Sequence, residues 1–393
     1  MNPRTKNRVF YVIVVAQFFG TSLWFAGNAI LPQLQLTFNW PSTSLGYLTS
    51  AIQLGFILGT LTFAIFGLAD KFSPSRIFFL SCLAAGAANL FSLVDISSVK
   101  LMISTRFAVG FFLAGIYPIG MKIASDWKAE GLGHWLGALV GALVLGTAFP
   151  HCLKLIPELV SPGKLLIAIS ALCGTGGLLL LVVVPDGPYR KKSSSFTFLA
   201  LQKVFRMPSF RSPAFGYFGH MWELYAFWAF VPWIVGRYAA SHALPLNESL
   251  LSFLIIGSGA VGCIVGGITS TRVGSAHVAR FALVCSGLCC LFSPMLWLLM
   301  PAVFIGVMIF WGIMAAADSP QFSALVARHA PDEFRGSAIT LVICVGFSIT
   351  IGSIQLLNYL QYIVPYEYLL LILTPGPILG VMAFNRSFLL NKT

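Results

Sequence analysis

One strongly apolar stretch of the sequence carries both a base and an acid. Residues 216–233 read GYFGHMWELYAFWAFVPW, with His220 and Glu223 in the middle. Residues three apart share a helix face, so these two side chains lie on one stripe. A charge deep in a bilayer costs about 2.5–3.5 kcal/mol on insertion scales, which favours protonation, pairing or a wet cavity. We expect Glu223 to load and release a proton, with His220 tuning it; a neutral Glu223 hydrogen-bonded within a helix bundle is the alternative.

A second acid and one arginine also interrupt apolar segments. Asp318 lies in MAAADSPQFSALVARH, and Pro320 removes a backbone donor and opens the helix locally. Asp318 is predicted to be a second proton-coupling carboxylate; the alternatives are a ligand for a cationic solute, a cap at the kink or a partner for Arg106. Arg106 keeps its proton and needs an anion nearby. Glu223, Asp318 or an anionic solute are the candidates.

The composition places these residues in a membrane protein. The 393 residues are 58% hydrophobic and only 9% charged, against roughly 25% charged in soluble proteins. Apolar runs of about twenty residues recur, and each spans a hydrocarbon core of about 30 Å as a helix. The sequence predicts an all-α polytopic membrane protein. The eight cysteines lie in apolar runs without C-x-x-C spacing, which predicts core packing and neither a metal site nor a cofactor.

The apolar runs predict twelve transmembrane helices. They cover residues 9–31, 45–68, 76–94, 100–123, 133–155, 164–184, 213–235, 249–270, 278–299, 302–324, 336–358 and 364–385. Between spans, nearly all Lys and Arg residues fall on one side, and the other side has only Lys100, Lys154, Lys164 and Arg237. The positive-inside rule then places both termini in the cytoplasm, and we expect a bacterial inner membrane. The net charge of +12 follows from topology, and no nucleic-acid partner is expected.

The longest polar interval divides the chain into halves. We predict a six-helix bundle over residues 1–185, a cytoplasmic linker over 186–212 and a second six-helix bundle over 213–393. Features repeat at an offset of about 200 residues, as in transporters with duplicated halves. Pro32 and Pro232 are expected to end spans one and seven, and YPIG from Tyr117 corresponds to SPQF from Ser319. The twelve helices therefore form two pseudo-repeats.

Polar residues inside spans are expensive and indicate which helices face a polar interior. Spans six, nine and twelve have none away from their ends, and span three has only Asn89. We expect these four spans to lie outside, facing lipid, and the other spans to form an inner ring around a wet cavity. The residues predicted to contact a solute there are Asn28, Gln53, Arg106, Tyr117, His151, Gln321 and Gln355.

Two motifs resemble those of the major facilitator superfamily. The loop FGLADKFSPSRIFF places Asp70, Lys71 and Arg76 in the acidic and basic positions of its signature, although Gly67 lies three rather than four residues before Asp70 and Ser73 replaces the second glycine. RFAVG in span four resembles a second motif of that family, an arginine four residues before a glycine. The resemblance covers essentially the whole chain. It implies that the three loop charges act in gating, as a lock between helices; a solvated loop is the alternative.

The resemblance also implies a function. A member of this family is expected to be a secondary active transporter that works by alternating access, and the embedded charges suggest a small organic solute moved with protons. Uptake by symport and export by antiport, of a drug or a metabolite, both stay open. Partners would be the solute, protons and membrane lipid, with the protein a monomer. A membrane-embedded lipid-modifying enzyme is a weaker alternative, because no D-x-x-D, H-x-x-x-D or H-E-x-x-H occurs. A non-transporting receptor is another.

Overall fold

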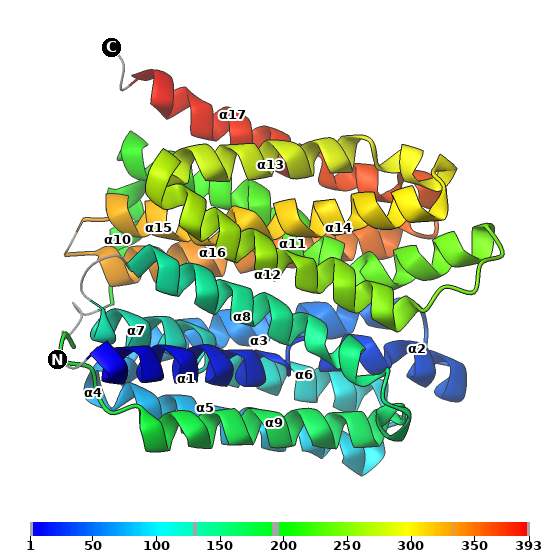
Figure 1. The fold of residues 1–393 in the computed structure, drawn as a ribbon, viewed down its shortest axis with the longest axis horizontal. Helices are drawn as coiled ribbons and strands as arrows, with labels where there is room; N and C mark the ends of the chain where they lie inside the picture. Colours follow the sequence, from blue (N-terminus) through cyan, green and yellow to red (C-terminus); the bar gives the residue numbers. More distant parts are fainter. Residues whose placement is uncertain (1–2, 129–131, 191–195, 332, 391–393) are drawn as a thin grey trace. The chain divides into compact units, whose positions relative to one another are not determined.

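The computed structural model describes residues 3–128, 132–190, 196–331 and 333–390 (Figure 1). Every regular element in these ranges is a helix, which confirms the predicted all-α class. The chain divides into two compact units, Met1–Ser195 and Phe196–Thr393, called unit 1 and unit 2 below. Each unit is described by itself.

Unit 1 contains the first six spans, two of them made of consecutive shorter helices. Its α-helices are α1 (Pro3–Thr21), α2 (Ala26–Phe38), α3 (Ser44–Ile65), α4 (Leu68–Lys71), α5 (Pro74–Phe91), α6 (Val99–Leu113), α7 (Tyr117–Trp127), α8 (Leu132–Leu153) and α9 (Pro162–Val183). Short 3-10 helices follow α5 at Ser92–Asp95 (η1) and precede α9 at Pro157–Leu159 (η2).

Unit 2 contains the other six spans and one short helix. Its α-helices are α10 (Leu199–Phe205), α11 (Pro208–Ser241), α12 (Glu248–Val273), α13 (Ser275–Leu291), α14 (Pro301–Ala317), α15 (Ser319–His329), α16 (Arg335–Leu360) and α17 (Pro375–Leu390), with 3-10 helices at Ser293–Leu298 (η3) and Tyr366–Leu373 (η4). α10 and the first turn of α11 fall in the expected linker. α11 begins at Pro208 rather than 213, because a proline is well suited to the first position of a helix. Residues 191–195 of that interval lie outside the described residues.

Ten described helical runs are long and apolar enough to cross a membrane. The remaining two of the twelve expected spans are α13, whose α-helical part is shorter, and α11, which is 34 residues long but carries several charged and polar side chains. Together they give the twelve-helix arrangement that the sequence predicts.

Proline positions correct one prediction and confirm another. Pro32 and Pro232 lie inside α2 and α11, so they do not end spans one and seven. Membrane helices tolerate such prolines because neighbouring groups satisfy the freed carbonyl. The opening expected at Pro320 is present, since α14 ends at Ala317 and α15 begins at Ser319. Span four is broken in the same way before Pro118, where α6 ends at Leu113 and α7 begins at Tyr117.

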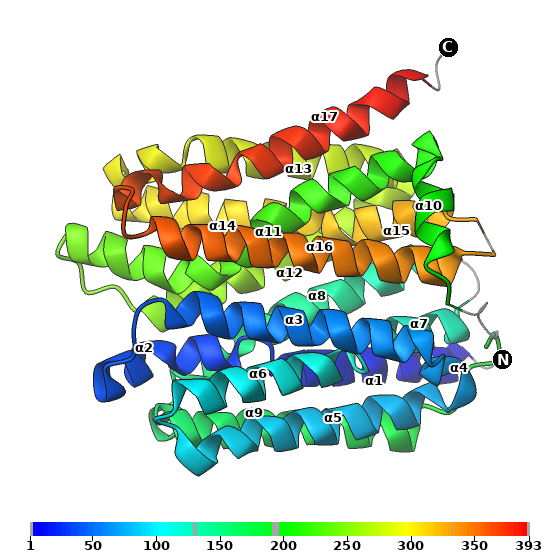
Figure 2. The same ribbon diagram turned by 180° about the vertical axis from the view of Figure 1, so that it is seen from behind.

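Both units use the same helix pairing, with closely packed glycines. α3 packs along α6 in unit 1 (Figure 2), and α12 packs along α14 in unit 2. In each pair a glycine lies directly against a main-chain carbonyl of the other helix: Gly110 against Ile52, and Gly312 against Ile255. A Cβ at either glycine would overlap that carbonyl. The glycine of RFAVG is therefore explained by the close approach of two backbones.

The Gly110 contact predicts a stability difference between two identical substitutions. Gly110→Ala places a methyl group against the Ile52 carbonyl, and overpacking of this kind costs about 1–3 kcal/mol. Gly174→Ala in α9 is the matched control, because no atom lies within 4 Å of the Cβ it would add. Thermal unfolding of the purified protein in detergent should show a lower midpoint for Gly110→Ala and an unchanged or slightly higher one for Gly174→Ala. Equal midpoints would contradict the packing explanation.

Candidate functional site

Glu223 is buried in unit 2 and held by two neutral donors. Its side chain on α11 is 2% exposed. Its Oε1 accepts a hydrogen bond from Trp311 Nε1 on α14 at 2.6 Å, and its Oε2 accepts one from Ser286 Oγ on α13 at 2.9 Å. Trp311 is fixed by stacking on Phe227, with ring centroids 4.4 Å apart. Among the described residues, no Lys, Arg or His forms an ion pair with Glu223.

His220 and Asp318 form a second buried contact in the same unit. His220 Nδ1 lies 2.8 Å from Asp318 Oδ1, and both side chains are at most 1% exposed. Asp318 lies at the break between α14 and α15, so the pair joins α11 to the discontinuous span. The His220 ring lies near those of Tyr217 and Phe322, with ring centroids 5.9 and 6.4 Å away. A histidine beside a carboxylate is an arrangement that can hold or pass on a proton.

The three residues predicted to couple protons therefore lie in one unit, with two partners that the sequence analysis missed. We call His220, Glu223, Asp318, Ser286 and Trp311 the acid cluster. Trp311 is the one side chain with a nitrogen donor in α14, PAVFIGVMIFWGIMAAA. The sequence could therefore have indicated it as a hydrogen-bond donor to a buried acid. Ser286 is one of many small hydroxyl residues in the spans and had no distinguishing signal.

The predicted solute contacts of unit 1 include several buried polar groups. Asn28 Nδ2 on α2 donates to Thr49 Oγ1 on α3 at 2.9 Å. Arg106 on α6 donates through Nη2 to Asn89 Oδ1 on α5, a partner that the sequence analysis did not find. Both amide atoms of Gln53 and the Nε2 of His151 are buried with no hydrogen-bond partner among the described residues.

The remaining residues predicted to contact a solute are Tyr117, Gln321 and Gln355. Tyr117 is half-buried at the start of α7. In unit 2, Gln321 is buried on α15 and Gln355 is half-buried on α16. A solute-binding role for these residues stays a prediction. Among the described residues, no group of three or more His, Cys, Asp or Glu side chains is placed to hold a metal ion.

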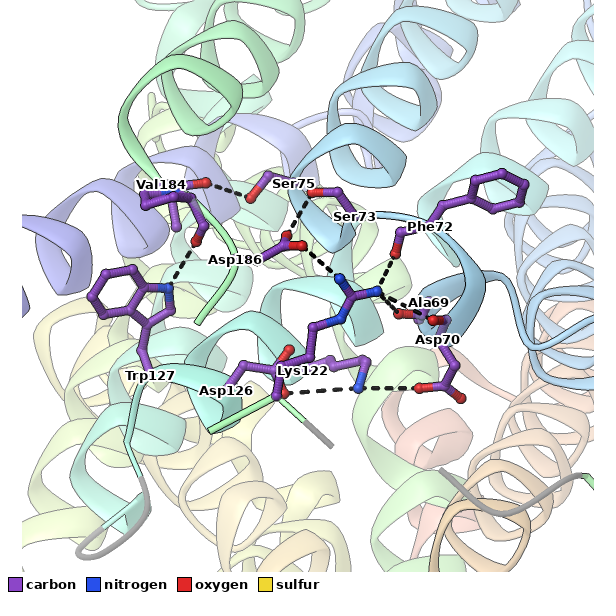
Figure 3. Close-up of polar contacts among 12 residues, drawn as sticks. Ala69, Asp70, Phe72, Ser73, Ser75, Lys122, Asp126, Trp127, Val184 and Asp186 are labelled. Carbon is purple, nitrogen blue, oxygen red and sulfur yellow. Dashed lines mark hydrogen bonds and ion pairs between the residues drawn. The ribbon is translucent and has the colours of Figure 1, made fainter. Parts of the chain in front are cut away.

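The residues predicted to gate are separated by the structure. Asp70 in α4 pairs with Lys122 Nζ on α7 at 3.3 Å, and Lys122 also lies 3.8 Å from Asp126 (Figure 3). Lys71 and Arg76 are exposed, and neither forms an ion pair among the described residues. Only Asp70 therefore joins a charge network, and its basic partner comes from span four rather than from its own loop.

The segment after α9 is tied to the loop between α3 and α5. Arg190 Nη1 lies 2.5 Å from Asp186 Oδ2, and its Nη2 donates to the main-chain oxygens of Phe72 at 2.7 Å and Asp70 at 3.2 Å. Ser73 Oγ donates to Asp186 Oδ1 at 2.7 Å (Figure 3). A guanidinium thus satisfies carbonyls at the end of α4, where a positive charge is favourable.

Two further hydrogen bonds attach the same segment to α7. Trp127 Nε1 donates to the Pro185 oxygen at 3.1 Å, and the Tyr189 main-chain N–H donates to the Asp126 oxygen at 3.0 Å. We call residues 184–190 the strap. The strap fastens the ends of three spans of unit 1 to one another. The motif PDGPYR forms most of the strap, with Asp186 and Arg190 four residues apart in the sequence.

Comparison with known proteins gives the family. The family model described as Major Facilitator Superfamily matches residues 13–353. The chain therefore belongs to this superfamily, and it is a membrane transporter rather than an enzyme. A search of curated proteins found no match.

Solved structures of transporters share the fold at low sequence identity. The human organic anion transporter MFSD10 (TETRAN) aligns with a TM-score of 0.73 and 13% identity, covering 98% of this chain and 99% of its own. A variant of the nucleoside transporter NupG gives 0.71 and 15%, covering 97% and 100%. A variant of the E. coli fucose:proton symporter FucP gives 0.68 and 16%, covering 96% and 98%. At these identities the likeness shows the fold alone.

The strap predicts a local change in backbone protection. Arg190→Gln removes the cation that binds the Phe72 and Asp70 carbonyls, so residues 184–190 should detach more often. Hydrogen–deuterium exchange of peptides covering the strap and residues 68–73 should be faster in the variant, because local opening governs amide exchange. Arg76→Gln removes an exposed charge from the same loop region and should leave both peptides unchanged. Equal exchange in the two variants would contradict the contact.

Proposed function

We propose that this transporter couples the movement of a small organic solute to the movement of protons, in the same or the opposite direction, by alternating access, and that the acid cluster carries the proton. The observation that carries the proposal is the setting of Glu223. A fully buried carboxyl on α11 receives hydrogen bonds from two neutral donors and no ion pair among the described residues, and the His220–Asp318 pair lies on the same helix and the adjoining break.

The physical chemistry of this setting supports reversible protonation. Burying a charge without a counter-ion is costly, so Glu223 takes up a proton while water is excluded. Water admitted to the cluster solvates the anion and favours release. His220 and Asp318 provide a nearby acid–base pair that can accept the proton or stabilise the charged state. The same carboxyl is thus loaded in one state of the cycle and emptied in another.

The broken span gives the acid cluster a place to respond to movement. Asp318 lies between α14 and α15, and discontinuous helices are common at the ion and substrate sites of secondary transporters. Of the neighbouring structures, FucP is a fucose:proton symporter. A protein with this fold can therefore couple solute transport to protons, which supports the proposal.

The membrane orientation is proposed from charge. The strap, α4 and the basic end of α7 lie at the end of unit 1 where Lys and Arg concentrate in the sequence. The positive-inside rule assigns this end, and both termini, to the cytoplasm. We also propose that this membrane is a bacterial inner membrane. The Asp70–Lys122 pair would then act as a cytoplasmic gating contact within unit 1.

Solute-driven proton movement in proteoliposomes tests the proposal. The purified chain is reconstituted with a pH-sensitive dye inside, and candidate neutral, cationic and anionic organic solutes are added outside. A coupled solute should change the internal pH, acidifying the lumen in symport and alkalinising it in antiport. Glu223→Gln cannot release a proton, and we expect it to lower the solute-driven pH change at least tenfold.

A matched substitution controls for general damage. Glu158→Gln makes the same chemical change at an exposed carboxylate in η2 and should retain the wild-type signal. Solute flux that proceeds without any pH change, and equally well in Glu223→Gln, would overturn proton coupling. Binding without flux for every solute would instead favour a non-transporting receptor.

A further inference from the structure

Arg106 places a positive charge inside unit 1 with one described partner. Its side chain on α6 is 1% exposed. Nη2 donates to Asn89 Oδ1, whereas Nε and Nη1 are buried without a hydrogen-bond acceptor among the described residues. Arginine keeps its proton in proteins. Within the described part of the chain, one neutral amide is therefore the hydrogen-bond acceptor for a full charge in the interior.

Asn89 positions the guanidinium but does not neutralise it. Its Nδ2 donates to the Leu166 main-chain oxygen at 3.0 Å and to Ser170 Oγ at 2.8 Å, both on α9. With the amide nitrogen committed to these two acceptors, the amide oxygen must face Arg106. The α5–α9 contact therefore fixes the direction of the arginine head group.

No described carboxylate of unit 1 balances this charge. All of them lie near the ends of spans, in ion pairs, in local hydrogen bonds or exposed to solvent: Asp70, Asp95, Asp126, Glu158 and Asp186. The remaining acid, Glu130, lies outside the described residues. Ionisable groups inside a membrane protein pair with another charge or mark a substrate path. In the described part of unit 1, the pairing charge is not supplied by the chain.

Helix α2 lies against the stem of Arg106, and polar side chains follow next to that contact on α2 and along α3. A Cβ at Gly27 of α2 would lie 2.9 Å from Arg106 Cδ, so the glycine leaves room for the arginine stem. The next residue, Asn28, donates to Thr49 on α3. Gln53 is one turn further along α3, on the face that Thr49 shares. Both of its amide atoms are buried without a partner among the described residues, so this face offers an unused donor and an unused acceptor.

From these contacts we infer that the transported solute is a small organic anion with a carboxylate group, and that Arg106 binds that carboxylate. The inference rests on the proposed function and adds the substrate class to it. One guanidinium balances one negative charge, and its free N–H groups match carboxylate oxygens. A phosphate dianion would leave an excess charge at a single arginine. Gln53 is placed to hydrogen-bond a neutral polar part of the solute.

Ligand-induced thermal stabilisation tests the inference with defined probes. The purified full chain is titrated in detergent, at constant chloride, with benzoate, lactate and pyruvate, each beside its neutral amide. We expect at least one carboxylate to raise the unfolding midpoint and its amide to leave the midpoint unchanged, since a ligand stabilises the state it binds. Arg106→Gln should lower the affinity for that carboxylate at least tenfold. Lys100→Gln removes a positive charge from the exposed start of the same helix and should bind like the wild type.

A second variant keeps the test decisive if Arg106→Gln does not fold. Arg106→Lys retains the positive charge but has a single side-chain nitrogen. This variant should bind the carboxylate more weakly than the wild type does, and should still bind the carboxylate more tightly than it binds the amide. The inference is overturned if no carboxylate exceeds its amide, if chloride alone gives the full stabilisation, or if substitution of Arg106 leaves the affinity unchanged.

The outcome is separable from that of the proposed function. A carboxylate that binds through Arg106 but moves no protons in proteoliposomes would refute proton coupling and leave this inference standing. A neutral solute that moves protons through Glu223 would refute this inference and leave proton coupling standing.

Discussion

The cost of burying charge in an apolar helix bundle is the constraint on which the other features depend. Glu223 and Arg106 are each almost fully buried, and each is contacted by neutral groups: Trp311 and Ser286 for the acid, and Asn89 for the base. A chain with 9% charged residues retains such groups inside its spans at a cost in stability. The proposed roles of these two residues require that neither charge is cancelled permanently by a fixed ion pair, because a cancelled charge binds neither a proton nor an anion.

The backbone supplies the geometry that makes these sites possible. The break at Asp318 brings a carboxyl to His220, and the glycines at positions 110 and 312 allow neighbouring helices to approach until a carbonyl meets the glycine. Equivalent pairs of helices pack in the same way in each unit. The polar chemistry differs, however: unit 2 holds the acid cluster, and unit 1 holds the arginine. A duplicated scaffold has thus been given different side chains in its two copies.

The sequence predicts the scaffold well because its signals are local. Apolar runs gave the spans, and Pro320 gave the break at Asp318, since both depend on a few adjacent residues. The predicted helix ends at Pro32 and Pro232 are wrong because a proline often ends a helix in water, whereas the surroundings of a membrane helix can accept one in its interior. The contact partners of individual side chains are harder to predict from the sequence. Asn89, Ser286 and the strap residue Arg190 find their partners across the fold, and a single sequence carries little information about which helix faces which.

The central claim is that Glu223 is protonated in the closed cluster and gives up that proton. Infrared difference spectroscopy of the purified protein measures this directly, because a protonated carboxyl has a carbonyl stretching band that a carboxylate lacks. The account predicts a band at neutral pH that is absent from Glu223→Gln and still present in Glu158→Gln, and whose intensity changes when a coupled solute is added. A spectrum in which Glu223→Gln removes no such band would show that Glu223 is permanently ionised, and this would contradict the account.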